Sequence, residues 1–526
     1  MSRARIVHGL AAFVGALGLL LPCTARAQSS RAPAMASAYL PVDDPAYGLL
    51  DALQRRGYVP SLPALERPYT VAQVQQALAA IDTVAAPSVI RRWVARVTQA
   101  VGKYALVPTE DSDAVTLKVH VGAMATGQSS GLRELMLADS TAGLHPGLNA
   151  RALLGRGPLV AAFRLRGDNA LRDDPEYAGF GGGLAGTPGG GLGVSGRAEE
   201  AYAAVQLPML ELFAGRLSRN WGPSAYDGML LGRAAWSYDH VMARIGDERF
   251  RMTWMTARLT DYGPDSRWLT ARRIGGRVRG VELGLSESVV YSGPGRQFEW
   301  GLSNPFIPGY LSLYNDREAA NLNVAFDVAV PTSFGLFAAQ TFADDVQLDG
   351  DTPKPWMYGV TVTADGLPLA GAHRWFASVT EISNLTYRNV TANDVYTTDF
   401  VSLGRGFTDY REVRLGADLA VLPQGTFRPY VAVRWQGTGT YRNPFPAEAA
   451  WPTTPRILQG PVMTIARLAI ESTLYAGPQF EVVADVGVNR VTSLGYVPGS
   501  NTVRPAGRVR VQWEPTSAWR AVFGSR

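Results

Sequence analysis

From about residue 115 to its end, the chain alternates apolar and polar residues one by one. In one segment, Val324, Phe326 and Val328 share one face, while Ala325 and Asp327 share the other. The same pattern recurs at 356–365, 412–421 and 480–489. A period of two indicates an extended strand with one apolar and one polar face. Charged residues recur on the polar face far down the chain, which is typical of a barrel with lipid outside and a polar lumen.

This alternation predicts about 18 strands. We place them near residues 115–124, 148–155, 158–167, 198–206, 210–217, 238–245, 249–258, 267–274, 277–290, 319–330, 334–342, 356–365, 373–382, 410–421, 427–437, 463–474, 479–490 and 507–514. Ser517–Phe523 is an alternative last strand, and if it is one, an earlier strand is miscounted.

The connections between the strands are alternately tight and long. Tight turns are predicted at 208–209, 246–248, Gly275-Gly276, 331–333 and 476–478. Long connections are predicted at 125–147, 168–197, 218–237, 291–318, 343–355, 383–409, 438–462 and 491–506. Outer-membrane barrels combine short periplasmic turns with long external loops in this way. The fold class predicted for residues 111–526 is therefore all-β, a transmembrane antiparallel up-and-down β-barrel.

The N-terminus has the features of a secretory signal peptide. Arg3 and Arg5 precede an apolar run from Ile6 to Leu21, and Ala25-Arg26-Ala27 forms a small-x-small cleavage site. We predict cleavage after Ala27 and export, which leaves a periplasmic, secreted or outer-membrane protein; the barrel pattern favours the bacterial outer membrane. No later segment approaches 18 uninterrupted apolar residues, so no transmembrane helix is predicted.

Residues 28–110 are predicted to form a small helical module. Its three short amphipathic helices begin near Asp44, after Thr70 and after Pro87-Ser88. Each is too short to be stable alone. We therefore expect the module to pack against the periplasmic mouth of the barrel.

Composition excludes several kinds of site. The single cysteine, Cys23, lies inside the predicted signal, so the mature chain has no disulfide, thiolate metal site or cysteine nucleophile. The signal carries three arginines and no acid, so its removal lowers the formal charge from +5 to +2, which gives no case for nucleic-acid binding. The histidines show no paired metal-ligand spacing, and the glycine-rich stretch 179–193 lacks the strand and helix of a dinucleotide loop. No metal or cofactor is predicted.

Three aspartates and a histidine admit a catalytic interpretation. Asp239-His240 and Asp344-Asp345 are similar to the acid–base sets of outer-membrane proteases, in which a carboxylate polarises His to activate water. The chain is much longer than those enzymes and lacks their surrounding motifs. Solvated loop charges are the preferred interpretation, and no enzymatic activity is predicted.

Aromatic residues crowd the long connections. Some are expected at the membrane interface. Others, beside amides and charged groups, are suited to a carbohydrate surface, since sugar C–H faces stack on aromatic rings and polar side chains bind the hydroxyls. The predicted polysaccharide-binding residues are Trp221, Trp300, Asn304, Tyr310, Tyr314, Asp316, Arg317 and Trp451.

The sequence resembles the Wzi-type capsule-assembly family of outer-membrane proteins. The resemblance is carried by the leader 39–51, by Arg67-Pro68-Tyr69-Thr70, by the block 215–223 with Trp221-Gly222-Pro223 followed by Leu230-Leu231-Gly232, by 285–291, and by 342–345. It spans nearly the whole mature chain, and the leader and the Trp-Gly-Pro block are its most specific parts.

The resemblance implies an 18-stranded barrel with a periplasmic N-terminal helical bundle. It also implies a lectin-like role without catalysis, in which capsular polysaccharide or exopolysaccharide is held at the cell surface. The expected partners are this polysaccharide, outer-membrane lipid and the barrel-assembly machinery. The main alternative is a diffusion channel, in which Arg414, Asp418, Glu481, Asp485, Arg508 and Arg510 line a water-filled lumen.

Overall fold

The structure is a computed structural model, and every residue it describes belongs to one compact unit, Met35–Arg526. The described residues are 36–106, 114–129, 131–133, 135–138, 142–168, 195–235, 237–316, 320–344, 354–477, 479–515 and 518–523. The predicted signal peptide and its cleavage site lie outside these ranges.

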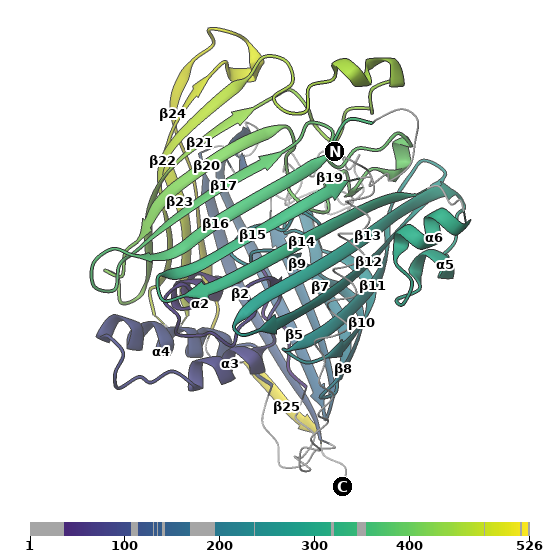
Figure 1. Cartoon of the computed structure of the whole chain (residues 1–526). Helices are drawn as coiled ribbons and strands as arrows, with labels where there is room; N and C mark the ends of the chain where they lie inside the picture. Colours follow the sequence, from purple (N-terminus) through teal and green to yellow (C-terminus); the bar gives the residue numbers. More distant parts are fainter. Residues whose placement is uncertain are drawn as a thin grey trace. The chain divides into compact units, whose positions relative to one another are not determined.

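Most of the chain forms a closed antiparallel β-barrel of 18 strand positions (Figure 1). Its strands are β2 (Val115–Gln128), β5 (Gly143–Arg156), β6 (Leu159–Asp168), β7 (Ser195–Gln206), β8 (Leu210–Leu217), β10 (Tyr238–Gly246), β11 (Phe250–Tyr262), β12 (Asp265–Val278), β13 (Val281–Pro294), β14 (Asn321–Thr332), β15 (Gly335–Asp344), β16 (Tyr358–Pro368), β17 (Arg374–Ile382), β20 (Tyr410–Asp418), β21 (Gly425–Gln436), β22 (Met463–Tyr475), β23 (Phe480–Thr492), β24 (Thr502–Trp513) and β25 (Trp519–Phe523). The predicted strands and their number are confirmed.

The last position is shared by β24 and β25. β24 pairs with the second half of β2, from Ala123↔Trp513 onward, and β25 pairs with the first half, from Val115↔Phe523 to Val119↔Trp519. Both candidate last strands therefore exist. They occupy one position in succession, so no earlier strand was miscounted.

The strand alternation is inverted relative to that of a soluble protein. On β20, Leu415 is 47% exposed, whereas Asp418 on the other face is fully buried. On β16, Val362 is exposed, whereas Thr361, Thr363 and Asp365 are buried. The apolar face is thus the outer surface and the polar face lines the lumen, the arrangement of a barrel wall that faces lipid.

The connections have the predicted asymmetry, and we call the two ends of the barrel the short-turn end and the long-loop end. One predicted turn is wrong. Gly275 and Gly276 lie inside β12, and the chain reverses at Arg279-Gly280, where φ is positive for both residues. A Cβ on Gly276 would lie 2.2 Å from the carbonyl oxygen of Arg249, so this glycine permits close contact with a neighbouring strand.

The three predicted helices are present as α2 (Ala46–Arg55), α3 (Val71–Ala79) and α4 (Ser88–Gly102). The hydroxyl of Thr70 caps α3 by accepting a hydrogen bond from the backbone N–H of Gln73. In turn, the side-chain oxygen of Gln73 accepts a hydrogen bond from the backbone N–H of Thr70. The helices share a core that includes Tyr475 of β22, and the Trp93 Nε1 donates to the carbonyl of Leu422 at 2.9 Å. The module therefore packs on the short-turn end. Among the described residues, no helix has the length and apolar character needed to cross a membrane.

Candidate functional site

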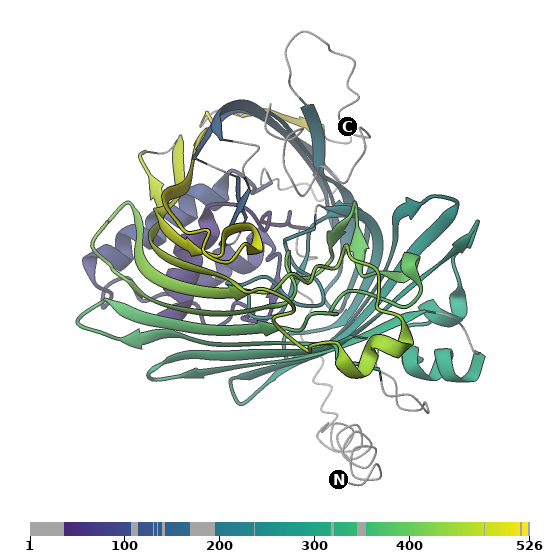
Figure 2. The ribbon, with the colours of Figure 1, turned by 90° about the horizontal axis from the view of Figure 1, so that it is seen from above.

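Segments from both ends of the barrel meet inside its lumen. β1 (Glu66–Arg67), which precedes α3, pairs with β9 (Asn220–Trp221), which belongs to the long connection between β8 and β10. Residues 220–232 then pack beneath the connection 383–409 from the same end. We call these three segments (64–67, 220–232 and 387–403) the lumenal plug. Figure 2 shows chain segments crossing the interior of the strand ring.

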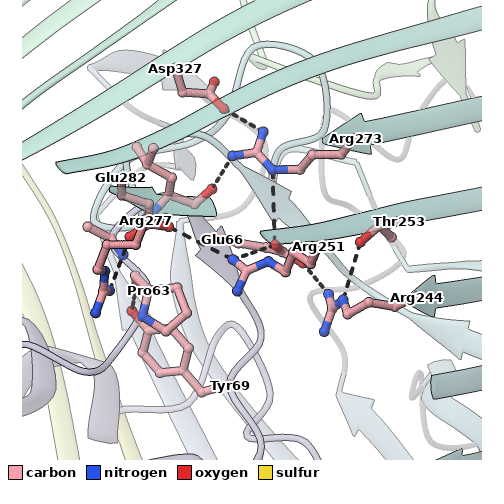
Figure 3. A network of polar contacts seen from close by, with 12 residues as sticks. Pro63, Glu66, Tyr69, Arg244, Arg251, Thr253, Arg273, Arg277, Glu282 and Asp327 are labelled. Atoms are coloured by element: carbon pink, nitrogen blue, oxygen red, sulfur yellow. Dashed lines mark hydrogen bonds and ion pairs between the residues drawn. The ribbon is translucent and has the colours of Figure 1, made fainter. Parts of the chain in front are cut away.

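Glu66 forms the charged centre of the plug (Figure 3). Its carboxylate accepts a hydrogen bond from Arg244, and it lies 2.9 Å from Arg251 Nη2 and 4.0 Å from Arg273 Nε. These arginines come from β10, β11 and β12, so one plug side chain joins three neighbouring wall strands. Burial alone would raise the pKa of Glu66, but the three guanidinium groups lower it to about 2.

A second carboxylate fixes the neighbouring backbone. Glu282 of β13 accepts hydrogen bonds from the N–H groups of Ala64 (2.8 Å) and Leu65 (3.3 Å). The Arg273 guanidinium also binds Asp327 and donates to the Leu65 carbonyl at 3.3 Å. Wall charges that a channel would present to water are used here to hold the plug.

The middle of the plug is built around Trp221. Its side chain is fully buried, and Gln340 of β15 donates to its backbone carbonyl at 2.8 Å. The same Gln340 accepts from the Met229 N–H at 2.8 Å. A fully buried indole offers no surface to an external ligand, so the structure contradicts the prediction that Trp221 contacts polysaccharide.

The top of the plug is the connection 383–409. Tyr387 and Tyr396 are buried, and their hydroxyls donate to the carbonyls of Met229 (2.7 Å) and Leu230 (2.9 Å). Arg267 of β12 points inward and donates to the carbonyls of Asn393 and Val395. This long connection therefore folds back into the lumen.

Asp394 is expected to make the connection 383–409 sensitive to pH. Burial raises the pKa of its carboxyl to about 6, although a hydrogen bond with Ser292 and the charges of Arg296 and Arg267 oppose the rise. An unfolded Asp titrates near 3.9, so between roughly pH 4 and pH 6 the folded loop retains a proton that the unfolded loop has lost. The stability of this loop should therefore fall as pH rises through that window, by at most about 3 kcal/mol.

We expect Asp394→Asn to remove this dependence and to protect residues 387–403 at pH 8. Amide hydrogen exchange of residues 387–403 at pH 5 and pH 8, corrected for intrinsic rates, measures the protection of this segment in wild type and variant. Asp261→Asn, an exposed residue at the β11–β12 tip, is the control. Equal protection of wild type at both pH values would contradict the assignment.

One aromatic residue of the plug loop is displayed outward. β18 (Thr397–Thr398) and β19 (Val401–Ser402) form a hairpin with a two-residue loop, Asp399-Phe400. Both loop residues have positive φ, 50° and 61°, a conformation that Gly, Asn and Asp adopt readily and that costs a residue such as Phe400 of order 1–3 kcal/mol. Phe400 is 38% exposed and stacks on Tyr262, with ring centroids 4.7 Å apart. A strained backbone conformation that leaves a phenylalanine ring exposed to solvent indicates that this ring contacts another molecule. Because the second loop residue is Phe and not Gly, the sequence lacks the Asn-Gly or Asp-Gly signal of a two-residue hairpin, and sequence reasoning missed it.

The remaining predicted sugar-binding residues are not gathered in one place. Trp451 lies in η3 (Glu448–Thr453) of the β21–β22 connection, half-buried against Phe445 in an edge-to-face contact. Trp300 and Asn304 lie at the helix α5 (Trp300–Ser303), and Tyr310, Tyr314 and Asp316 belong to α6 (Gly309–Asp316). The side chains of Tyr310, Tyr314 and Asp316, and all of Arg317, fall outside the described part. The binding role of these residues stays a prediction.

The contacts of His240 lend no support to a hydrolase. Its Nε2 accepts from Arg219 Nε at 2.9 Å, its Nδ1 faces the Tyr238 carbonyl at 3.0 Å, and its ring stacks on Phe213. Asp239, next to it on the strand, pairs with Arg216. Asp345 lies outside the described residues. Within the described ranges, no group of three or more His, Cys, Asp or Glu residues is arranged to hold a metal.

Each of the six residues predicted to line a pore forms an ion pair or a hydrogen bond with another part of the protein. Asp418 binds Arg55 and Arg56 of the helical module, and Glu481 binds Lys103 at 3.0 Å. The other contacts are Arg414 with Glu471, Asp485 with Arg467, Arg508 with Gln128, and Arg510 with the Asp43 carbonyl.

No protein-family model and no curated protein matches this sequence. Among solved structures, the chain is similar to Wzi from Escherichia coli, described as an outer-membrane protein involved in group 1 capsule assembly and a carbohydrate-binding β-barrel. The two share 14% identity over 91% of this chain and 98% of Wzi, with a TM-score of 0.60. Weaker likenesses are to Pseudomonas aeruginosa OccK1 (OpdK), at 14% identity, 77% and 99% coverage and a TM-score of 0.43, and to OpdQ of the same organism, at 10%, 76% and 97%, and 0.41. The chain thus has the Wzi-type fold that its sequence resemblance implies: an 18-stranded antiparallel β-barrel with N-terminal helices at the short-turn end.

Proposed function

We propose that this chain is an outer-membrane protein that binds a surface polysaccharide and helps to attach or organise it at the cell surface. In this proposal the signal peptide is removed on export, the short-turn end with α2–α4 faces the periplasm, and the long-loop end faces outward. Outer-membrane lipid and the barrel-assembly machinery are the expected partners of such a barrel. No catalytic step is included.

The lumenal plug is the observation that carries the proposal. Its segments are tied to the wall by Glu66, Glu282, Arg267 and Gln340, and the predicted pore residues are engaged in pairs. A diffusion channel needs an open lumen through which solute passes, whereas a lectin-like barrel needs only the exposed surface of its long-loop end. The likeness to a barrel described as carbohydrate-binding supports the same choice.

The long-loop face offers aromatic groups suited to sugar. Phe400 presents one ring face to solvent above Tyr262, and Asp399, its neighbour in the same two-residue turn, supplies a carboxylate. An aromatic face with adjacent hydrogen-bonding groups is a recurring surface for pyranose rings. Phe445 and Trp451 supply a second aromatic pair on the β21–β22 connection.

Binding of the detergent-purified protein to capsular polysaccharide or exopolysaccharide from its own host tests this function. We expect Phe400→Ala to weaken binding by about 1–3 kcal/mol, roughly 5- to 150-fold in Kd, by analogy with the loss of a stacked base. Phe334→Ala is the matched control, because Phe334 is 66% exposed in a turn at the opposite end. Isothermal titration with both variants gives the comparison.

A second measurement concerns the cell. Deleting the gene should reduce the polysaccharide retained on the surface, and the Phe400→Ala variant should restore less than wild type does. The function proposed here is refuted if the purified protein does not bind the host's polysaccharide and its deletion leaves surface retention unchanged.

A further inference from the structure

A group of polar side chains lies on the outer face of the barrel wall. On β12, Leu269, Ala271 and Arg273 point into the lumen, where Arg273 binds the plug. The alternate residues Thr270 and Arg272 therefore point outward. On β13, Ser288 faces the lumen and donates to or accepts from the Tyr396 hydroxyl at 2.9 Å, so Glu287, Val289 and Tyr291 point outward.

Arg272 and Glu287 form an ion pair on this outer face, with Nη1 and Oε1 2.7 Å apart. Arg272 is six residues from Val278, the short-turn end of β12. At about 3.3 Å per residue and a strand tilt near 40°, it lies about 15 Å above that end, within an apolar band about 25 Å tall. A bare arginine on the lipid face is strongly unfavourable at mid-depth, so this pair requires a cover.

The cover is the helical hairpin formed by α5 and α6, which we call the wall hairpin (residues 298–316). The Arg272 guanidinium donates to the carbonyls of Leu302 (2.6 Å) and Asn304 (2.9 Å), where α5 ends. The Glu287 carboxylate accepts from the N–H of Gly309, where α6 begins, at 2.8 Å. Each member of the ion pair thus satisfies the terminus of one helix.

Further contacts attach the hairpin to the wall. Trp254 Nε1 donates to the Ser303 carbonyl at 2.5 Å, and the hydroxyls of Thr270 and Ser303 lie 2.7 Å apart. Leu302 packs with Val289, Tyr291 and Leu322 in a small buried cluster. A Cβ on Gly309 would lie 2.7 Å from the Val289 side chain, so the backbone of α6 lies directly on the wall.

The opposite face of the hairpin is apolar and uncovered. Trp300 is 61% exposed and Phe306 78% exposed, and Ile307 and Leu311 are also exposed. Residues 300–315 contain no Lys, Arg, Asp or Glu. The side-chain oxygen of Asn304 accepts a hydrogen bond from the backbone N–H of Phe306 at 3.0 Å, so this polar group is satisfied within the hairpin. Figure 1 shows α5 and α6 beside the strands, below the long-loop tips of β12 and β13.

We propose that the wall hairpin is immersed in the outer leaflet, with Trp300, Phe306 and Leu311 against lipid acyl chains. Its apolar face continues the apolar outer face of the neighbouring strands, and its inner face shields the Arg272–Glu287 pair from hydrocarbon. The inference rests on one part of the proposed function, namely that the barrel spans the outer membrane. For Trp300 it replaces the expectation of sugar stacking.

Single-cysteine labelling tests this directly, because the chain has no cysteine after Cys23. Phe306→Cys and Trp300→Cys are each labelled with an environment-sensitive NBD fluorophore in the full-length mature protein. The labelled protein is reconstituted in phosphatidylcholine vesicles with and without doxyl groups on the acyl chains. Two matched positions are Val431→Cys, exposed on the outer wall, and Val497→Cys, exposed in the β23–β24 loop.

We expect the label at 306 to emit at the blue-shifted wavelength of the label at 431 and to be quenched by acyl-chain doxyl. The label at 497 should emit as in water and remain unquenched. If 431 behaves as lipid-facing and 306 behaves like 497, the hairpin proposal is overturned and the membrane assignment is kept. If 431 also behaves as in water, the membrane assignment itself fails, and the hairpin proposal with it.

Discussion

Replacing Glu66 with alanine is expected to destabilise the folded protein by about 3–5 kcal/mol, the usual cost of breaking a buried ion pair on one side. The change leaves the guanidinium groups of Arg244, Arg251 and Arg273 facing one another without their shared carboxylate. It also removes the charge that joins the plug to three wall strands. Thermal and urea unfolding in detergent micelles, followed by far-UV circular dichroism, measures the loss.

The pH dependence of this effect has a definite sign. The pKa of Glu66 is lowered to about 2 in the folded state, from about 4.3 in an unfolded chain. Its contribution is therefore complete above about pH 4.3 and is lost as pH falls towards 2. The shift corresponds to about 3 kcal/mol, at the lower end of the expected loss. The difference between wild type and Glu66→Ala should shrink over this interval.

Glu248→Ala is the matched control for Glu66→Ala, because Glu248 is exposed in the short turn between β10 and β11. It should unfold within about 0.5 kcal/mol of wild type. Glu66→Gln retains the acceptor oxygen without the charge and should lie between wild type and Glu66→Ala. If Glu66→Ala matches Glu248→Ala at neutral pH, the charged network does not hold the plug in place.

Removing the two long-loop segments of the plug should turn a silent barrel into a conducting one. We expect wild type to show no large stable openings in planar bilayers. Replacing residues 219–235 and 386–404 with short Gly-Ser linkers should produce them, because barrels of 16–18 strands without a plug enclose an aqueous channel. Removing both segments is necessary because each packs on the other through Tyr387 and Tyr396.

The control for this experiment replaces residues 495–499, at the outer end of the β23–β24 connection, with a linker of equal length. That variant should stay silent. Large openings in wild type would favour the diffusion-channel alternative. A double variant that keeps its circular dichroism spectrum and remains silent would show that other parts of the chain close the lumen.

The barrel was predictable because its signal is local. Each strand must present alternate residues to two different surroundings, so segments such as 324–328 reveal their conformation without knowledge of their neighbours. The capping sequence from Thr70 to Gln73 is likewise local, and α3 begins where the sequence indicates. The Gly275-Gly276 error shows where this reasoning ends. Glycine permits a turn and also a close strand contact, and only the neighbouring Arg249 carbonyl distinguishes them.

The direction in which a long connection turns was not predictable. Trp221 and Phe400 both lie in connections at the long-loop end, yet one is fully buried and the other is displayed. The difference arises from distant partners, Gln340 for Trp221 and Tyr262 for Phe400, which no local pattern encodes. Trp300 posed a related difficulty, because aromatic residues without nearby charges suit a sugar platform and a lipid-facing helix equally well.

The broken final strand has a consequence for how the molecule is assembled. β25 is the only described partner of Val115–Val119 on that side of β2, and it follows all the other described strands in the chain. A chain released before Trp519 would keep an open edge of free amide and carbonyl groups along the first strand. Segment 64–67 lies inside the closed barrel. During membrane insertion it must therefore enter the lumen before β24 and β25 pair with β2 and close the ring.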